Sequence, residues 1–287
     1  MSMVMSGNRT KQQEISVVSR VLLYAVLIAF TCLTILPLVW LVMSSFKTTT
    51  EFYTNTLGLP RQWTAINYPA AWRIGQFNVL FLNSLFYTTV STTAIVFLSL
   101  AASFAFAKIR SFATPFLHGS FVIGILLTIQ SLMVPIFIMA YKTHLVDSRL
   151  GVLIPYVGLG LPLGVYLCSE FIKAIPDAVM ESARIDGAGY FKIFSLIIIP
   201  MTRPVVTTLS VLSVASIFNE FMLINILVGK DSLKSLPVGM MKFSSALSTD
   251  FGKQFAALVT GMVPIVLFYL VFRRQITKGV AAGAVKG

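Results

Sequence analysis

The sequence predicts an all-α integral membrane protein with six transmembrane helices. Hydrophobic residues make up 56% of the 287 residues and charged residues only 11%, whereas charged residues make up about a quarter of a typical soluble protein. The mean hydropathy is +0.86, so the chain lacks the charges that would cover a soluble surface of this size. Six apolar segments are each long enough to cross a hydrocarbon core, which needs about 20 residues. They lie near 21–43, 80–107, 116–141, 150–171, 205–228 and 254–272.

We expect each of the first three apolar segments to form a single helix. The first, 21–43, follows a polar stretch of twenty residues. It is too long for the apolar core of a signal peptide and lacks a small-residue cleavage site, so we expect the chain to keep it. The loop that follows, 44–79, carries Trp63, Tyr68 and Trp72. These aromatic residues predict a partly ordered cap at the membrane surface.

The fourth span is rich in glycine and proline. Such a composition permits a broken helix that lines a substrate path, as in many transporters. It equally permits close packing against a neighbouring helix, and the sequence leaves both interpretations open. The residues concerned are Gly151, Pro155, Gly158, Gly160, Pro162 and Gly164.

The fifth span contains Asn219 and Glu220, and Glu220 is the only acid deep in a predicted span. An ionisable group there costs a few kcal/mol and usually faces a cavity or a partner. Two interpretations stay open: a polar patch that lines a substrate pathway, or a structural hydrogen bond to a neighbouring helix. A proton relay is disfavoured because no second acid accompanies it. The sixth span ends directly before Arg273 and Arg274, which we expect to anchor it.

The positive charges predict the orientation and exclude a nucleic-acid-binding protein. The loops on the N-terminal side of the membrane hold 13 Lys and Arg, and the other loops hold 9. This bias places both termini in the cytoplasm, including the tail 273–287. The net charge of +12 is scattered between apolar runs, so no continuous phosphate-binding face forms. A basic excess of this kind suits contact with anionic membrane lipid.

The sequence shows no catalytic, metal or redox site. No P-loop pattern occurs, so the sequence offers no nucleotide-binding site of that kind. No Gly-x-Ser-x-Gly elbow or His-Glu-x-x-His helix is present. His118 and His144 stand apart without partners at metal-ligand spacing. Cys32 and Cys168 both fall inside apolar segments and form no CxxC pair. We therefore predict a protein that is not an enzyme and binds no metal or cofactor of its own.

The loop 172–204 predicts a short helix, a sharp corner and a second helix. Pro176 suits the first helical position, and Asp177 complements the positive end of the helix dipole. Gly187 suits the position just past the helix end, and Glu181 can pair with Arg184. A second helix follows, with an apolar stripe of Phe191, Phe194 and Ile198, and Pro200 and Pro204 break the chain before the fifth span. Such an element can dock another protein, or it can lie as an amphipathic hairpin on the lipid headgroups.

The same loop resembles the EAA loop of ABC importer permeases. That pattern reads Glu-Ala-Ala-x-x-Asp-Gly-Ala-x5-Phe-x2-Ile-x2-Pro-x3-Pro, and only Ser182 departs from it by replacing Ala. The C-terminal tail and the run Asn219-Glu220-Phe221 are similar to carbohydrate-importer permeases of the maltose type, and the resemblance covers essentially the whole chain. It implies a coupling loop formed by Glu181, Ser182, Ala183, Arg184, Asp186, Gly187 and Ala188.

The resemblance implies one permease domain, 1–287, with the type I ABC importer fold, in a prokaryotic plasma membrane. Its first loop helix would sit in a groove of a cytoplasmic ATPase subunit. The implied partners are a homologous second permease, two ATP-binding subunits that hold the ATP and Mg, and an extracytoplasmic sugar-binding protein. The implied function is sugar or oligosaccharide import, with Asn219 and Glu220 as pathway residues. A permease for a non-sugar solute is the alternative. An ion-coupled carrier is disfavoured because the chain lacks two matching halves.

Overall fold

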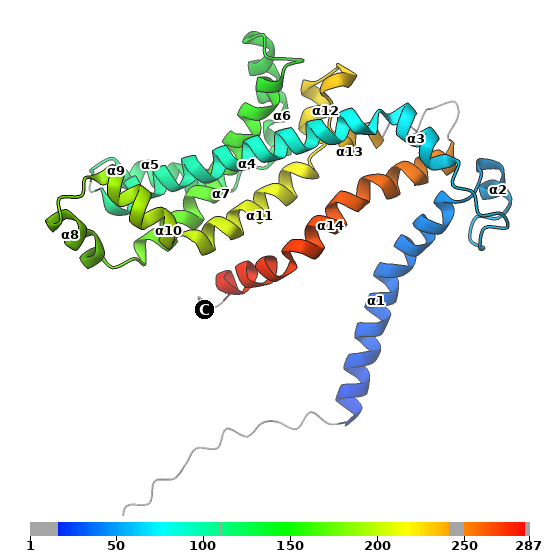
Figure 1. Cartoon of the computed structure of the whole chain (residues 1–287), viewed down its shortest axis with the longest axis horizontal. Coiled ribbons are helices and arrows are strands. Elements are labelled where there is room, and N and C mark those ends of the chain that lie inside the picture. The colour runs from blue at the N-terminus through cyan, green and yellow to red at the C-terminus, as the bar shows by residue number, and fades with distance from the viewer. Residues whose placement is uncertain (1–16, 110, 241–249, 285–287) are drawn as a thin grey trace, which may run out of the picture.

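The computed structural model describes residues 17–109, 111–240 and 250–284, and helices form every regular element of that part of the chain. Predicted features at residues 1–16, Arg110, 241–249 and 285–287 lie outside the described residues. The elements are α1 (Val17–Ser45), α2 (Thr49–Thr54), α3 (Asn67–Gly75), α4 (Phe77–Lys108), α5 (Thr114–Gly124), α6 (Ile129–Lys142), α7 (Arg149–Lys173), α8 (Asp177–Ile185), α9 (Tyr190–Ile193), the π-helix η1 (Phe194–Ile198), α10 (Ile199–Met201), α11 (Arg203–Phe218), α12 (Met222–Leu227), the 3-10 helix η2 (Asp231–Leu233), α13 (Leu236–Met240) and α14 (Phe251–Ala284) (Figure 1).

The helices provide the six predicted spans, but two of the spans are broken. Helices α1, α4, α7 and α14 are each long and apolar enough to cross a membrane alone. The pair α5 and α6 is bent by 106°, and the segment α9–α10 meets α11 at 73°. With each bent pair counted as one span, the number of crossings is six.

The predicted extents of the third and fifth spans were therefore wrong. The third, 116–141, is interrupted after Gly124, and α6 begins anew where the Thr128 hydroxyl accepts a hydrogen bond from the Ser131 N–H. The fifth, 205–228, stops as a helix at Phe218, and α12 is a separate short helix. Averaged hydropathy missed both breaks because it records the apolar composition of the whole segment and not where a helix ends.

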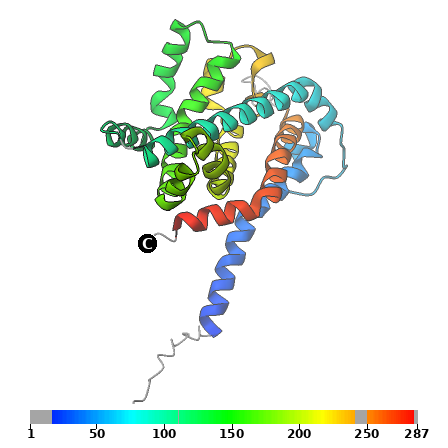
Figure 2. The same cartoon turned by 60° about the vertical axis from the view of Figure 1, so that its left-hand side comes forward.

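The core is formed where α4 and α7 lie side by side (Figures 1 and 2). Two glycines of α7 make the close approach possible: Gly160 faces Ile95 and Gly164 faces Ser99, both on α4. Ser103 of α4 also donates a hydrogen bond to the Val165 carbonyl at 3.0 Å. Helix α7 is continuous through both of its prolines. The fourth span is therefore not a broken helix, and two of its glycines serve close packing.

Helix α1 extends away from this core and touches it near its C-terminal end (Figure 1). Trp40 packs against Phe255 of α14 with ring centroids 5.4 Å apart, while the apolar side chains earlier in α1 are exposed. The loop 44–79 is ordered, as predicted, and contains α2 and α3. Its centre is the buried Lys47, whose Nζ donates to the carbonyls of Asn55 at 2.7 Å and Gly58 at 2.6 Å.

The α4–α7 contact can be tested with two glycines of the same helix. A methyl group at Gly164 would lie 3.0 Å from Cβ of Ser99 and 3.3 Å from Cδ2 of Leu209, whereas one at Gly158 would meet nothing within 4 Å. We expect Gly164→Ala to destabilise the protein by about 1–3 kcal/mol through overpacking. Gly158→Ala should be neutral or slightly stabilising, because alanine favours helix. Thermal unfolding in detergent measures both, and equal melting temperatures would contradict the proposed contact.

Candidate functional site

The loop 172–204 places α8 at one end of the bundle, opposite α2 and α3 (Figure 1). The predicted helix–corner–helix shape is confirmed: α8 ends at Ile185 and α9 begins at Tyr190. Met180 and Ala183 form the buried side of α8. Because protein already covers this apolar side, the geometry favours a protruding element over a hairpin that lies flat on lipid.

A Schellman motif forms the corner after α8. Gly187 has a φ of +76°, the left-handed conformation that the sequence predicted there. Its N–H donates to the Arg184 carbonyl at 2.9 Å, and the Ala188 N–H donates to the Ala183 carbonyl at 2.9 Å. Both bonds satisfy carbonyls at the end of α8 that would otherwise have no partner. The direction in which the chain leaves α8 is therefore fixed by backbone geometry.

The start of α8 is fastened to the end of α4. The Lys108 Nζ donates to the Ile175 carbonyl at 2.6 Å and pairs with the Asp177 carboxylate at 2.6 Å. Only 5% of the Lys108 side chain is exposed, so this bond is shielded from solvent on the lysine side. Pro176 caps α8 and Asp177 is the first helical residue, one position later than predicted.

The outward side of α8 is polar and charged. Glu181, Ser182, Arg184 and Asp186 are all exposed, as is Ile185. The predicted ion pair between Glu181 and Arg184 is wrong. The Arg184 guanidinium instead lies over the Tyr190 ring, 4.8 Å from its centroid, a cation–π contact that ties α8 to α9.

The second helix returns towards the membrane with a π-helical turn. Phe194 and Ile198 are buried as predicted, and the Phe194 ring lies 5.4 Å from that of Phe104 on α4. Phe191 is 83% exposed, so its predicted place on the apolar stripe is wrong. The π-helical turn, η1, ends two residues before Pro200, whose ring and missing N–H disfavour a regular α-turn. At the 73° bend, the buried Thr202 hydroxyl donates to the Ile198 carbonyl.

Glu220 lies in the break between α11 and α12, and its carboxylate accepts three hydrogen bonds. It accepts a hydrogen bond from the Tyr156 hydroxyl of α7 at 2.6 Å. It also accepts from the backbone N–H groups of Leu223 at 2.7 Å and Ile224 at 3.3 Å, which open α12. The carboxylate thus caps α12 and joins it to α7. The structure favours the structural interpretation of Glu220.

The two predicted pathway residues are not equivalent. Glu220 and Tyr156 line a cavity of about 140 Å³ between α7 and α11, together with the hydroxyl groups of Ser213 and Ser216. Asn219 is exposed, and its side chain donates to the Ala215 carbonyl of its own helix at 2.7 Å. Tyr156 was not predicted as a site residue, because no local sequence pattern connects it to Glu220, 64 positions away.

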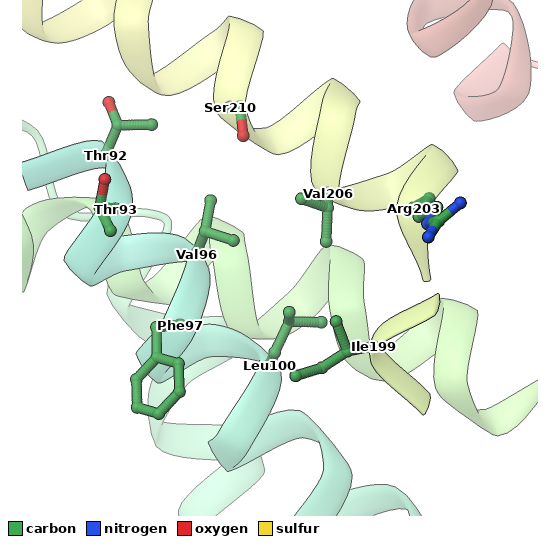
Figure 3. Close-up of a pocket in the computed structure, with 9 residues that line it drawn as sticks. All are labelled: Thr92, Thr93, Val96, Phe97, Leu100, Ile199, Arg203, Val206 and Ser210. Carbon is green, nitrogen blue, oxygen red and sulfur yellow. The ribbon is translucent and has the colours of Figure 1, made fainter. Parts of the chain in front are cut away.

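A larger groove of about 360 Å³ opens between α4 and α11 (Figure 3). Arg203, the first residue of α11, lies at one end, and Thr92 and Thr93 of α4 lie at the other (Figure 3). The middle of the groove is apolar, with Val96 of α4 and Val206 of α11 among its lining residues. Helix α11 is therefore incompletely packed on two sides.

The described residues contain no group of three or more His, Cys, Asp or Glu side chains able to hold a metal ion. His118 packs edge-on against Phe106, with ring centroids 6.0 Å apart. His144 is exposed at the end of α6, with a φ of +56°. Cys168 is buried within α7.

Comparisons with known proteins agree with this architecture. The family described as binding-protein-dependent transport system inner membrane component has a sequence model that matches residues 99–280, which include α8 and the Glu220 break. The chain is 30% identical over 274 residues to the probable ABC transporter permease protein YurM of Bacillus subtilis, covering 96% of this chain and 89% of that one.

A second relative and one solved structure extend the comparison. The chain is 31% identical to the probable starch degradation products transport system permease protein AmyC of Thermoanaerobacterium thermosulfurigenes, covering 90% of this chain and 94% of that one. Its fold is similar to a chain of a bacterial ABC transporter involved in import of the acidic polysaccharide alginate, with a TM-score of 0.79 at 19% identity. That match covers 90% of this chain and 98% of the other.

The neighbouring residues Asn219 and Glu220 allow a matched test of the break. Glu220→Gln replaces one acceptor oxygen by an NH₂ group, so one of the three donors loses its acceptor. We expect a loss of about 1–3 kcal/mol and a lower melting temperature. Asn219→Ala removes only an exposed side chain and should change stability by less than about 0.5 kcal/mol. Equal melting temperatures for both variants and the wild type would refute the capping role of Glu220.

Proposed function

Because the chain belongs to the family of binding-protein-dependent transport system inner membrane components, we propose that it is the permease subunit of an ABC importer for a sugar or oligosaccharide. ATP hydrolysis takes place in separate ATP-binding subunits. The chain itself supplies the membrane path and the docking element for those subunits.

The observation that carries this proposal is the presentation of α8. Its apolar side is buried, its start is fastened by Lys108, and its end is fixed by the Gly187 corner. Glu181, Ser182, Arg184 and Asp186 therefore face outward on a helix that cannot easily change direction. A rigid charged surface of this kind suits binding in a protein groove. Because the helix is already ordered within the permease, it loses little conformational entropy when it binds.

Carbohydrate as the cargo is supported by the relatives and by the cavity. One relative is named for starch degradation products, and the similar structure belongs to an alginate importer. The cavity beside Glu220 offers the hydroxyls of Ser213 and Ser216 on an otherwise largely apolar wall. Hydroxyl groups of a sugar are recognised by such hydrogen-bonding groups, and its ring faces are recognised by apolar ones.

In the mechanism that we propose, closure of two ATP-binding subunits displaces α8. The displacement reaches α4 through the Lys108–Asp177 pair, and α11 through α9 and α10. A homologous second permease completes the membrane path, and an extracytoplasmic binding protein delivers the sugar to the outer loops. The subunit lies in the plasma membrane with α8 and both termini on the cytoplasmic side, the orientation that the positive-charge bias favours.

The corner is tested by two glycines that lie two positions apart. Gly187 has a φ of +76°, whereas Gly189 has a φ of −73° and a ψ of 168°, which any residue adopts. A side chain at either position would meet nothing within 4 Å. We expect Gly187→Val to strain the corner by about 1–2 kcal/mol or more, to weaken association with the ATP-binding subunit and to abolish uptake.

Gly189→Val is the control and should retain both functions. A pull-down of the ATP-binding subunit and a sugar-uptake assay on the same membranes measure the outcome. Equal losses in the two variants would show that added bulk, not the backbone of the corner, is responsible. Wild-type behaviour of Gly187→Val would remove the corner from the coupling mechanism.

Charge reversal at Asp186 separates docking from folding. A lysine at the C-terminal end of α8 is favourable for the helix dipole, so Asp186→Lys should not destabilise the helix. We nevertheless expect it to weaken ATPase association and abolish uptake, with Asp186→Asn intermediate. Co-purification of the ATP-binding subunit over a salt series measures the effect, since a charge-dependent contact weakens with salt. Undiminished association of Asp186→Lys would place Asp186 outside the contact.

A further inference from the structure

We propose that residues 219–221 form a hinge that divides the fifth span into two bodies, and that Asp147 is the positioning residue that holds the outer body in place. The inner body is α11, and the outer body is α12 with the loop 228–236. This inference rests on the proposed function where it concerns transport. The existence of the hinge can be tested without it.

Asp147 connects the turn between α6 and α7 to the end of α12. One carboxylate oxygen accepts hydrogen bonds from the backbone N–H groups of Gly229 at 2.6 Å and Lys230 at 2.9 Å. The Asp147 N–H donates to the Leu227 carbonyl at 2.9 Å. These hydrogen bonds, together with the nearby charges of Lys230 and Lys234, lower the pKa of Asp147. The carboxylate is therefore an ionised acceptor, and its hydrogen bonds are strong ones.

The backbone around Asp147 is bent into this position against its own preference. Asp147 has a φ of +58° and His144 a φ of +56°, so two non-glycine residues of one short connection are left-handed. A side chain disfavours this conformation because its Cβ comes too close to the backbone. Such conformations persist only where the surroundings determine them, and they cluster at functional positions. The connection is thus shaped to bring the Asp147 carboxylate to the 229–230 backbone.

The loop beyond α12 is fastened to α4 as well. The Asn83 amide donates to the carbonyls of Ser232 at 2.8 Å and Lys234 at 3.1 Å. The Tyr87 hydroxyl donates to the Leu233 carbonyl at 2.9 Å. Together with Asp147, these contacts attach the outer body both to α4 and to the connection between α6 and α7.

The inner body packs on α4, α7 and α14 through apolar side chains such as Leu209 and Ile217. Among the described residues, no side-chain hydrogen bond joins α11 to another helix, and spaces remain beside two parts of it. The groove of about 360 Å³ separates part of α11 from α4 (Figure 3), and the cavity of about 140 Å³ lies between α11 and α7. In an interior that is otherwise close-packed, such spaces are where one element can shift against another. Thr92 lines the groove and is 7% exposed, and its hydroxyl has no hydrogen-bond partner among the described residues.

Glu220 marks the boundary between the two bodies. Its backbone N–H donates to the Ile217 carbonyl and so continues the end of α11. Its carboxylate is bound by Tyr156, Leu223 and Ile224, all of which belong to α7 or the outer body. A rotation between α11 and α12 is therefore concentrated at the backbone of 219–221, while the outer body stays attached to α7.

Two substitutions at Asp147 separate its carboxylate from its backbone conformation. Glycine and asparagine both adopt positive φ readily, so neither adds strain, but only asparagine retains an acceptor oxygen. Hydrogen–deuterium exchange of the assembled importer in lipid nanodiscs is the measurement. For Asp147→Gly we expect amide exchange in residues 222–236 to rise by about tenfold, while exchange in residues 203–218 stays within about twofold of the wild type.

For Asp147→Asn, amide exchange in residues 222–236 should stay close to that of the wild type. The same result is expected for His144→Gly, which changes the other left-handed residue but removes no contact with the 229–230 backbone. In the same preparations, sugar uptake per ATP hydrolysed should fall several-fold for Asp147→Gly and recover in Asp147→Asn. Unchanged exchange in Asp147→Gly, or an equal rise throughout α11, would refute the hinge. Increased exchange in 222–236 with normal uptake per ATP would refute its part in transport. A wild-type importer that moves no sugar would refute the proposed function, while the exchange result would still decide the hinge.

Discussion

A polypeptide inside a membrane must satisfy its backbone hydrogen bonds without water, and this constraint explains where polar side chains lie in this protein. The Thr202 hydroxyl bonds to the Ile198 carbonyl at one bend. The Glu220 carboxylate receives the N–H groups that begin α12. Asp147 does the same for the backbone that follows α12. At each of these three places one side chain satisfies backbone groups that a continuous helix would have satisfied, and the Glu220 break separates α11 from α12.

The sequence predicted the features that depend on local chemistry. The left-handed corner at Gly187 and the helix that begins near Asp177 follow from the preferences of neighbouring residues, and the structure confirms them. The breaks after Gly124 and Phe218 were missed, because both interrupted segments remain apolar and hydropathy records composition rather than helix ends. The hydrogen bond between Tyr156 and Glu220 could not be predicted from the sequence, since it depends on how α7 packs against the fifth span.

Helix α4 connects the two ends of the molecule as a single element. Lys108 holds the start of α8 at one end, and Asn83 holds the outer loop at the other. Along its length α4 is pressed against α7 at Gly160 and Gly164. A rigid α4–α7 pair beside an α11 that is flanked by a groove and a cavity suits a subunit in which force applied at α8 is converted into movement of one helix past a fixed framework.

The central claim is that the exposed side of α8 contacts an ATP-binding subunit, and site-specific photocrosslinking in native membranes tests it most directly. A crosslinking amino acid at the exposed Ser182 should capture a protein that mass spectrometry identifies as carrying a P-loop. The same amino acid at Thr54 of α2, exposed at the opposite end of the molecule, should not capture it. Crosslinks from Ser182 to lipid alone, with the ATP-binding subunit present in the membranes, would contradict the account.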